Sequence, residues 1–291
     1  MLKVQLLQVR FTKEERLCWH TSFHIGGPAD YFCTPCSTAE LAEAIQFARE
    51  NGLPVHIVGS GTNLLVRDSH VPGIIISTKK MKGIFLTSST EVTAQCGAPL
   101  AQLISATCER GLSGLEALAG IPGTVGGAVF MNAGGKYGSI APVVQSVSTL
   151  TMDGERRFYD RSDLRFEYRK GPVTDEVITE VSLSLNRSSE TQVRCLVTGI
   201  LRERAASQPL SAMSAGCIFK NPGEISAGKL IDECGLKGQT SGRAQISPVH
   251  ANFIVNLGGA TASEVQSLIG LARRSVAERF GIELELEVTV I

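Results

Sequence analysis

GIPGTVGGAVFMNAGG, residues 120–135, contains six glycines and no charged side chain. A membrane-spanning helix needs about 20 good helix formers, and each glycine in a helix costs about 1 kcal/mol relative to alanine. We therefore predict a buried loop whose backbone approaches a ligand closely, because glycine has no Cβ. The N–H groups of such a loop form a concave site suited to phosphate. The alternative is a tightly packed glycine-rich turn in the core.

A second glycine-rich segment, 59–63, directly follows a predicted buried strand at 53–58. A strand that runs into such a turn is typical of a phosphate-binding loop. The segment does not match the Rossmann pattern, because Leu64 stands where the third glycine is required and no helical pattern follows. A further stretch, 223–229, has the spacing of a nucleotide phosphate loop, but Leu230 replaces the Ser or Thr that binds magnesium. We therefore do not predict an NTPase.

The composition is that of a soluble globular protein with room for two or more domains in 291 residues. Lys and Arg number 28 and Asp and Glu number 28, so the charge balance predicts neither a nucleic-acid nor a membrane partner. The first residues, MLKVQLLQVRF, lack the apolar core of a signal peptide. We expect a cytoplasmic protein with reduced thiols.

Cysteine spacing gives little support for a metal site. Of eight cysteines, Cys33 and Cys36 alone form a CxxC pair, and no second pair or neighbouring histidine completes a zinc set. The pair is interpreted as two spare thiols, with a redox motif as the alternative.

Hydrophobic periodicity and capping signals predict the following elements. Strand, turn and strand are expected over 19–32, then a helix from Ser37, its N-cap, to about Asn51, with Glu40 completing a capping box. Residues 164–169 are expected to lead into a strand pair. Further strands are predicted at 53–58, 64–66, 73–76, 83–87, 91–96, 143–151, 156–159, 176–185, 252–256 and 282–291, and helices at 99–110, 190–206, 226–234 and 261–280.

Eight blocks lie in order along nearly the whole chain: TSFHIGGPAD (21–30), GSGTNLLV (59–66), GIPGTVGGAVFMNAG (120–134), YR (168–169), SAGCIFKNP (214–222), AGKLIDECGLKG (227–238), HANFIVN (250–256) and LELEV (284–288). Together these blocks resemble the UDP-N-acetylenolpyruvoylglucosamine reductase family, flavoenzymes that complete UDP-N-acetylmuramic acid in bacterial wall synthesis. The short stretch between Tyr168-Arg169 and Cys217 is similar to the family's shorter form, which lacks an inserted substrate-capping loop.

The resemblance implies an α+β fold of the vanillyl-alcohol-oxidase (PCMH) type. It implies FAD-binding subdomains at 1–78, completed by the C-terminal strand 280–291, and at 79–208, with a substrate-binding domain at 209–279. FAD would be bound non-covalently, because no histidine lies in a flavin-attachment motif, and NADPH would donate hydride. The residues expected around the FAD diphosphate are Gly59, Ser60, Gly61, Thr62, Asn63, Gly120, Ile121, Pro122, Gly123, Thr124, Gly126, Gly127, Ala128, Asn132, Ala133 and Gly134.

The resemblance also implies three catalytic residues. Arg169 matches the arginine that stabilises negative charge on the substrate carboxylate, and a guanidinium fork suits that task. Cys217 stands where the family usually has the proton-donating serine, and a thiol with a pKa near about 8.5 is a plausible donor. Glu287 matches the C-terminal glutamate that assists. Without the resemblance, Arg169 would be an ordinary surface residue and Cys217 a buried one.

Lys220 and Asn221 are expected to contact the substrate, and no metal site is expected. The predicted activity is reduction of UDP-N-acetylglucosamine enolpyruvate to UDP-N-acetylmuramate, with no obligate protein partner. Two alternatives stay open at this point. One is a flavin oxidase of the same fold that is reoxidised by oxygen. The other is a non-catalytic nucleotide-binding or scaffolding protein, since the cysteine at position 217 departs from the usual serine.

Overall fold

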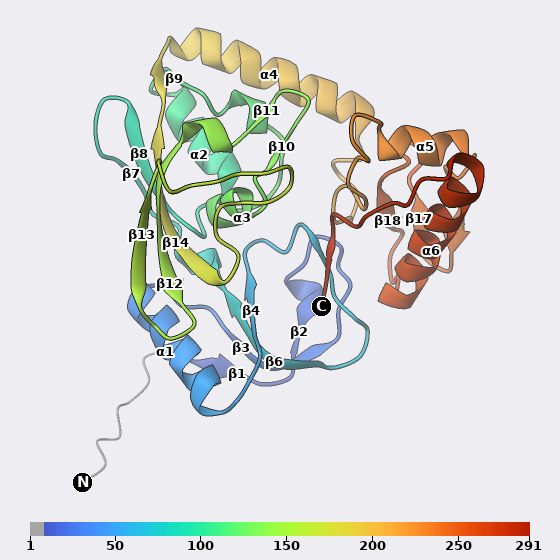
Figure 1. Ribbon diagram of the computed structural model, residues 1–291, viewed down its shortest axis with the longest axis horizontal. Helices are drawn as coiled ribbons and strands as arrows, with labels where there is room; N and C mark the ends of the chain where they lie inside the picture. Colours follow the sequence, from blue (N-terminus) through green and yellow to red (C-terminus); the bar gives the residue numbers. More distant parts are fainter. Residues whose placement is uncertain (1–8) are drawn as a thin grey trace. The chain divides into compact units, whose positions relative to one another are not determined.

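The computed structural model describes residues 9–291, which form two compact units (Figure 1). The first unit comprises the described residues up to Glu15 together with 30–60 and 72–201, and the second comprises 16–29, 61–71 and 202–291. The prediction that no signal peptide opens the chain falls largely on residues outside the described part. The predicted division into three domains stays a prediction.

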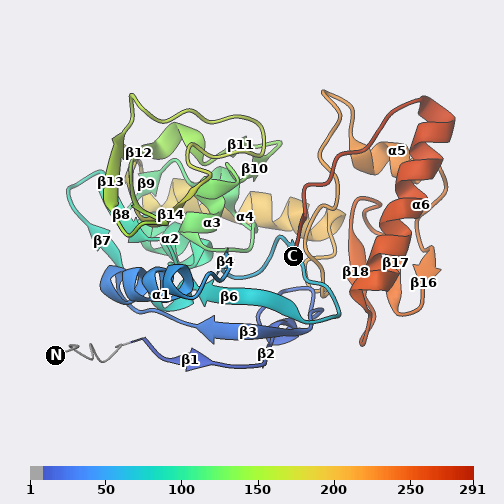
Figure 2. The same cartoon turned by 60° about the horizontal axis from the view of Figure 1, so that its bottom comes forward.

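The first sheet of the first unit has the strand order β1-β3-β6-β4, with bounds Phe11–Thr12, Pro28–Cys33, Val71–Ser77 and Val55–Val58. Strand β4 is parallel to β6, with Val55 opposite Ile74, whereas β1 is antiparallel to β3. Helix α1 (Thr38–Glu50) buries Leu41 and Ile45 in the same core as Ile74 and Ile76. Figure 2 shows α1 running alongside β6.

Ser37 caps helix α1 as predicted, because its hydroxyl accepts the Glu40 N–H. The predicted capping box was wrong in its second half. The Glu40 carboxylate accepts the N–H and the thiol of Cys36 instead of the Ser37 N–H. A carboxylate at this position reaches the nearest donor with good geometry, which here lies one residue before the N-cap.

The second sheet of the first unit is antiparallel, in the order β13-β12-β14-β8-β7. Val147 and Val181 of the central strands lie opposite each other and are fully buried, whereas the other face carries polar side chains, as expected when one face of an antiparallel sheet is solvated. The hairpin predicted around Asp153-Gly154 is confirmed, with Gly154 at φ 87°. The strands are β7 (Ile84–Leu86), β8 (Glu91–Gln95), β12 (Val144–Thr151), β13 (Arg156–Asp160) and β14 (Glu176–Ser184).

Three helices and several short elements complete the first unit. The helices are α2 (Leu100–Cys108), α3 (Val125–Phe130) and α4 (Glu190–Ser207), of which residues 190–201 belong to this unit. The short strand pairs are β9 (Leu112–Ser113) with β15 (Asn186–Arg187), and β10 (Gly134–Gly135) with β11 (Gly138–Ser139). The 3₁₀ turns are Thr78–Lys80, Glu116–Leu118 and Ala141–Val143.

The second unit is built on helices α5 (Ala227–Glu233) and α6 (Ala262–Phe280) and a three-stranded antiparallel sheet. Helix α6 begins with a capping box of Thr261 and Glu264 and ends at Gly281, whose φ of 67° is left-handed. The sheet consists of β16 (Thr240–Ser241), β17 (Ala244–Ile246) and β18 (Ile254–Asn256), and a parallel pair joins β5 (Leu64–Leu65) to β19 (Thr289–Val290). Short β2 (Glu15–Arg16) pairs with β3, and a 3₁₀ turn (Leu17–Trp19) follows it.

Three further predictions of local structure were wrong. No strand forms over 19–24, where the second unit has a 3₁₀ turn and a loop. Residues 164–169 do not lead into a strand pair, because a tight turn bridges Glu167 to Lys170. The C-terminal strand is confined to Thr289–Val290 and an isolated bridge at Leu286. In all three places single apolar side chains, such as Phe23 and Leu164, are buried without a continuous ladder of strand hydrogen bonds.

The glycine-rich stretch 120–135 is not a loop throughout, since α3 occupies its centre. Thr124 caps this helix by accepting the Gly127 N–H, and the first turn is buried at Val125 and Gly126. Tertiary packing therefore outweighs the poor helix propensity of two adjacent glycines. Among residues 9–291, no helix combines the length and the apolar character needed to cross a membrane.

Candidate functional site

The glycine-rich stretch is anchored in the first unit by backbone hydrogen bonds to the end of β8. Val125 N donates to the Ala98 carbonyl and Gly126 N to the Cys96 carbonyl, at 2.9 and 2.8 Å. Gly126 has no room for a side chain, because a Cβ there would lie 2.7 Å from the Cys96 Cβ. Before the helix, Gly120 and Gly123 have φ values of 82° and 144°, which L-residues with side chains rarely adopt. These three glycines are required by the fold itself.

Gly127 differs from its neighbours. It is exposed, and a Cβ there would meet only the Thr124 hydroxyl, at 3.4 Å, an ordinary contact. Among residues 9–291, no contact thus requires glycine at this helical position, where alanine is the better helix former by about 1 kcal/mol. A glycine here leaves the backbone open to close approach by a bound group.

The two predicted glycine-rich segments meet in the first unit. A Cβ on Gly59 would lie 2.5 Å from the Thr124 hydroxyl, so the backbone after β4 packs directly against the N-cap of α3. Ser60 is the next residue in the chain. The sequence predicted both segments to be cofactor loops, and the structure brings Gly59 to the cap of the helix that carries Gly126 and Gly127.

Two hydrogen bonds link the segment after α3 to the turn that carries Arg169. Asn132 Nδ2 donates to the Glu167 carbonyl and Arg169 Nη1 donates to the Gly134 carbonyl, both at 2.8 Å. Asn132 and Arg169 both have positive φ, 43° and 57°, and strained residues of this kind cluster at functional sites. Arg169 is half-buried, whereas its neighbour Lys170 is exposed and pairs with Glu167. Arg169 is therefore not an ordinary surface residue.

Asn132 also carries a buried polar atom that lacks a partner within residues 9–291. Its Oδ1 is buried and has no hydrogen-bond partner among the described residues. A buried acceptor without a donor is costly, so this atom, like the open Cβ position of Gly127, fits a bound group that supplies N–H or O–H. FAD is such a group, and the residues of the first unit that would hold it are those of segments 59–60, 120–128 and 132–134.

The rest of the glycine-rich segment 59–63, from Gly61 to Asn63, belongs to the second unit. Gly61 has a φ of 66°, and a Cβ there would lie 2.2 Å from the His20 carbonyl oxygen. Asn63 Nδ2 donates to the Glu287 carbonyl at 3.0 Å, and Thr289 N donates to the Asn63 carbonyl. Thr62 lies between Gly61 and Asn63 in the chain. This segment is thus bonded to the backbone of the predicted catalytic glutamate.

Cys217 and Glu287 lie on adjacent segments of the second unit. Phe219 and Leu286 form an antiparallel bridge, and both Glu287 N and Val288 N donate to the Ile218 carbonyl. Glu287 and Val288 thus lie opposite the single residue Ile218, which is the arrangement of a β-bulge. Bulges are common beside active sites because they redirect a side chain. Cys217 and Glu287 are both half-buried, while Glu283 and Glu285 are exposed. The bulge distinguishes Glu287 from the two glutamates before it.

Lys220 and Asn221 have defined protein contacts. The Lys220 ammonium lies 2.5 Å from Glu285 Oε1, with side chains 28% and 74% exposed. Asn221 Oδ1 accepts the N–H of Ala227, the first residue of α5. Lys220 is held at the surface by a carboxylate that a phosphate or carboxylate ligand would have to displace or share.

The predicted site residues therefore form two groups. Arg169 lies with the glycine segments of the first unit, and Cys217, Lys220, Asn221 and Glu287 lie together in the second. Sequence reasoning assigned no role to Asn252, whose side chain bonds the Cys217–Lys220 segment. Its place in the HANFIVN block was the available signal, because a polar residue between apolar strand positions needs buried partners.

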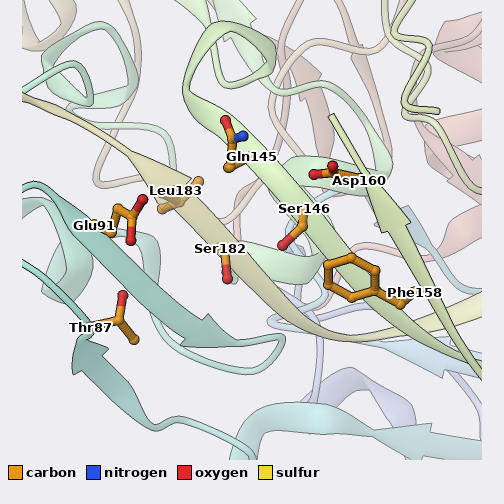
Figure 3. Close-up of a pocket in the computed structure, with 8 residues that line it drawn as sticks. All are labelled: Thr87, Glu91, Gln145, Ser146, Phe158, Asp160, Ser182 and Leu183. Atoms are coloured by element: carbon orange, nitrogen blue, oxygen red, sulfur yellow. The ribbon is translucent and has the colours of Figure 1, made fainter. Parts of the chain in front are cut away.

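A pocket of about 270 Å³ lies elsewhere, on the exposed face of the antiparallel sheet of the first unit (Figure 3). The hydroxyl of Ser182 bonds that of Thr93 on the adjacent strand. The lining residues include none of the predicted site residues: they are Thr87, Glu91, Gln145, Ser146, Phe158, Asp160, Ser182 and Leu183.

The cysteine pair has two different environments. Burial raises the pKa of the Cys33 thiol to about 12, and the exposed Cys36 has a raised pKa because its thiol donates to Glu40. Both are free thiols. A nucleophilic or redox-active cysteine needs a lowered pKa, so these shifts favour the interpretation as spare thiols.

Comparison with known proteins gives matches over almost the whole chain. Residues 29–158 match the model of the FAD binding domain family, and residues 208–291 match that of the UDP-N-acetylenolpyruvoylglucosamine reductase C-terminal domain. A relative from Lactiplantibacillus plantarum named UDP-N-acetylenolpyruvoylglucosamine reductase is 38% identical over 97% of this chain and 94% of its own length.

Two solved structures agree with these matches. The crystal structure of UDP-N-acetylenolpyruvylglucosamine reductase (MurB) from Thermus caldophilus has 38% identity and a TM-score of 0.83, covering 97% of this chain and 98% of that one. A solvent-stable cholesterol oxidase, at 20% identity and a TM-score of 0.50 over 61% of this chain and 38% of its own, shares the fold alone. The predicted α+β fold of the vanillyl-alcohol-oxidase (PCMH) type is confirmed.

Proposed function

Because this chain belongs to the UDP-N-acetylenolpyruvoylglucosamine reductase (MurB) family, we propose that it reduces UDP-N-acetylglucosamine enolpyruvate to UDP-N-acetylmuramate. The chain is an FAD-dependent oxidoreductase of peptidoglycan synthesis. The observation that carries the proposal is the 38% identity to a named reductase over 97% of the chain. NADPH, the reductant of this family, is the proposed hydride donor. When bound, FAD supplies a carrier that takes hydride from NADPH and delivers it to the vinyl carbon of the substrate.

The glycine segments have the proposed task of binding the diphosphate of the cofactor. The exposed backbone at Gly127 supports this role, whereas the buried acceptor Asn132 Oδ1 suits an N–H or O–H of the cofactor outside the diphosphate. Gly59 and Gly126 support it indirectly, because their close packing fixes the positions of the neighbouring N–H groups. A loop fixed in advance loses little conformational entropy when it binds a ligand.

Arg169 has the proposed task of stabilising the negative charge that develops on the substrate carboxylate. A group that binds this charge lowers the barrier when it interacts more strongly with the transition state than with the ground state. The Arg169 guanidinium lies over the Tyr168 ring, with Cζ 5.4 Å from the centroid, and donates to the Gly134 carbonyl. These contacts hold it beside the segment proposed to bind FAD.

Cys217 and Glu287 have the proposed task of delivering the proton that completes reduction. General acid catalysis requires a group that holds a proton and lies close to the accepting carbon. The bond between Glu287 N and the Ile218 carbonyl joins the two residues' segments. A thiol can fill the position of the family's serine, because it too carries one transferable proton.

The test is an anaerobic absorbance measurement on the purified protein reconstituted with FAD. NADPH should bleach the flavin band, and the enolpyruvyl substrate should then restore it, with UDP-N-acetylmuramate as the product. Restoration by oxygen but not by the substrate would replace the proposal with a flavin oxidase. Binding of the nucleotide sugar without consumption of NADPH would replace it with a non-catalytic protein.

A further inference from the structure

The segment Cys217–Lys220 is held between two neighbours in the second unit. On one side it bonds to the chain end: Lys220 N donates to the Glu285 carbonyl at 2.9 Å, and Glu287 N donates to the Ile218 carbonyl at 2.8 Å. The bridges at Cys217 and Phe219 are isolated ones, not parts of a regular strand. A segment without a full ladder depends on other partners for its remaining N–H and C=O groups.

Asn252 supplies those partners on the other side. Its main-chain carbonyl accepts the Ile218 N–H at 2.8 Å. Its side chain then bonds both backbone groups of Phe219, as Oδ1 accepts the Phe219 N–H at 2.9 Å and Nδ2 donates to the Phe219 carbonyl at 2.8 Å. One amide side chain thus replaces the pair of hydrogen bonds that a neighbouring strand would give. Phe219 lies between Cys217 and Lys220, so these bonds fix the backbone on which both side chains are carried.

Asn252 is itself rigidly held. It is 3% exposed, and its N–H donates to His250 Nδ1 at 3.2 Å. The His250 ring lies edge-on to Phe253, with 5.0 Å between centroids. The same ring packs on Gly228 of α5, where a Cβ would lie 2.9 Å from His250 Cε1. Burial lowers the pKa of His250 and so favours the neutral imidazole, in which Nδ1 can accept the bond.

We propose that Asn252 is a positioning residue for proton delivery and substrate binding, because its side-chain amide fixes the backbone between Cys217 and Lys220. This inference rests on the proposed function, in which Cys217 donates the proton. The chemistry selects asparagine: aspartate lacks the donor for the Phe219 carbonyl, leucine lacks both groups, and glutamine is longer by one methylene. A shift of about 1 Å at the donor atom is enough to cost about a hundredfold in rate.

Two variants separate the two bonds. Asn252→Leu removes both, and amide hydrogen exchange of the peptide 217–220 should rise at least about tenfold, since this backbone loses its buried partners. Asn252→Asp keeps the acceptor and removes the donor. In this variant, flavin reoxidation by the enolpyruvyl substrate should slow about tenfold or more at neutral pH. It should recover on acidification relative to wild type, because a protonated carboxyl group can again donate to the Phe219 carbonyl. The other titratable and charged groups here, His250, Lys237 and Asp232, are the same in both proteins, so wild type at each pH is the reference. Flavin reduction by NADPH should stay within about twofold of wild type.

Asn256→Asp is the matched control, since Asn256 is also a buried asparagine of the same strand region. Its side chain donates to the Phe23 carbonyl and accepts from Gly258 N and Ala260 N, not from the Cys217–Lys220 segment. It should lower stability without the selective rise in exchange at 217–220. Unchanged exchange in Asn252→Leu, or normal reoxidation in Asn252→Asp at every pH, would overturn the inference. If wild type carries out neither half-reaction, the proposed function fails, while the exchange measurement still tests the bonds of Asn252.

Discussion

Gly127→Ala should strengthen the folded protein and weaken its hold on FAD. In the flavin-free protein the new methyl group meets only the Thr124 hydroxyl, at 3.4 Å. Replacing glycine by alanine at a compatible helical position stabilises by about 0.4–1 kcal/mol, because the unfolded chain loses freedom. If FAD lies against this backbone, the same methyl group occupies its contact surface. Forcing a methyl group into a packed contact costs about 1–3 kcal/mol, which corresponds to a rise in Kd of roughly 5- to 150-fold.

Two other glycine-to-alanine substitutions serve as controls. Gly199→Ala in α4 adds a methyl group with no atom within 4 Å, so it should stabilise by a similar amount and leave FAD affinity unchanged. Gly126→Ala would place its Cβ 2.7 Å from the Cys96 Cβ, so it should destabilise even the flavin-free protein. The three effects separate helix propensity, internal packing and cofactor contact.

The assays are urea denaturation of the flavin-free protein and titration with FAD followed by flavin fluorescence. The expected pattern is increased stability with weakened binding for Gly127→Ala alone. Unchanged FAD affinity in this variant would show that the segment is a packed turn, the alternative that the sequence left open.

Further predictions concern the catalytic and titrating groups. In single-turnover flavin reoxidation, Cys217→Ser should keep substrate reduction. Cys217→Ala should slow it about 10²–10⁴-fold, the usual range for a lost general acid. Full turnover by the alanine variant would remove Cys217 from the mechanism. Arg169→Lys should slow the same step and leave NADPH oxidation nearly intact, because a lysine cannot form the guanidinium's forked contacts. An equal loss of rate in both half-reactions would argue for a structural role. Glu285→Gln should change the free energy of unfolding by less than about 1 kcal/mol, because the Glu285 carboxylate in its ion pair with Lys220 is 74% exposed. A larger change in urea denaturation would contradict this. Burial raises the pKa of Cys33 and of Cys96 from 9.0 to about 12. The stabilisation from keeping both thiols neutral is therefore complete below pH 9 and is lost as pH rises toward 12. In urea denaturation across this range, the free energy of unfolding of Cys96→Ala should fall less steeply with pH than that of wild type, and an identical pH dependence would refute the assignment.

The elements with strong local signals were predictable. Helices α1 and α6 carry an apolar stripe and a capping residue at Ser37 and Thr261, and both start within a residue of the predicted position. The hairpin of β12 and β13 follows from alternation around Asp153-Gly154. Helix α3 was missed because propensity counts its glycines as unfavourable, while the burial of Val125 and Gly126 against the end of β8 decides the outcome.

The sequence by itself determined the family, the fold class and the identity of the candidate residues, because ordered motifs and residue chemistry are written in the chain. The tertiary structure alone decided which of them meet. It bonds Asn63 to Glu287 and Arg169 to Gly134, and it makes Asn252 the partner of Phe219. These pairs lie 224, 35 and 33 residues apart, so no local pattern encodes them. They arise because buried backbone groups must find partners, and only the packed fold determines which side chains are within reach.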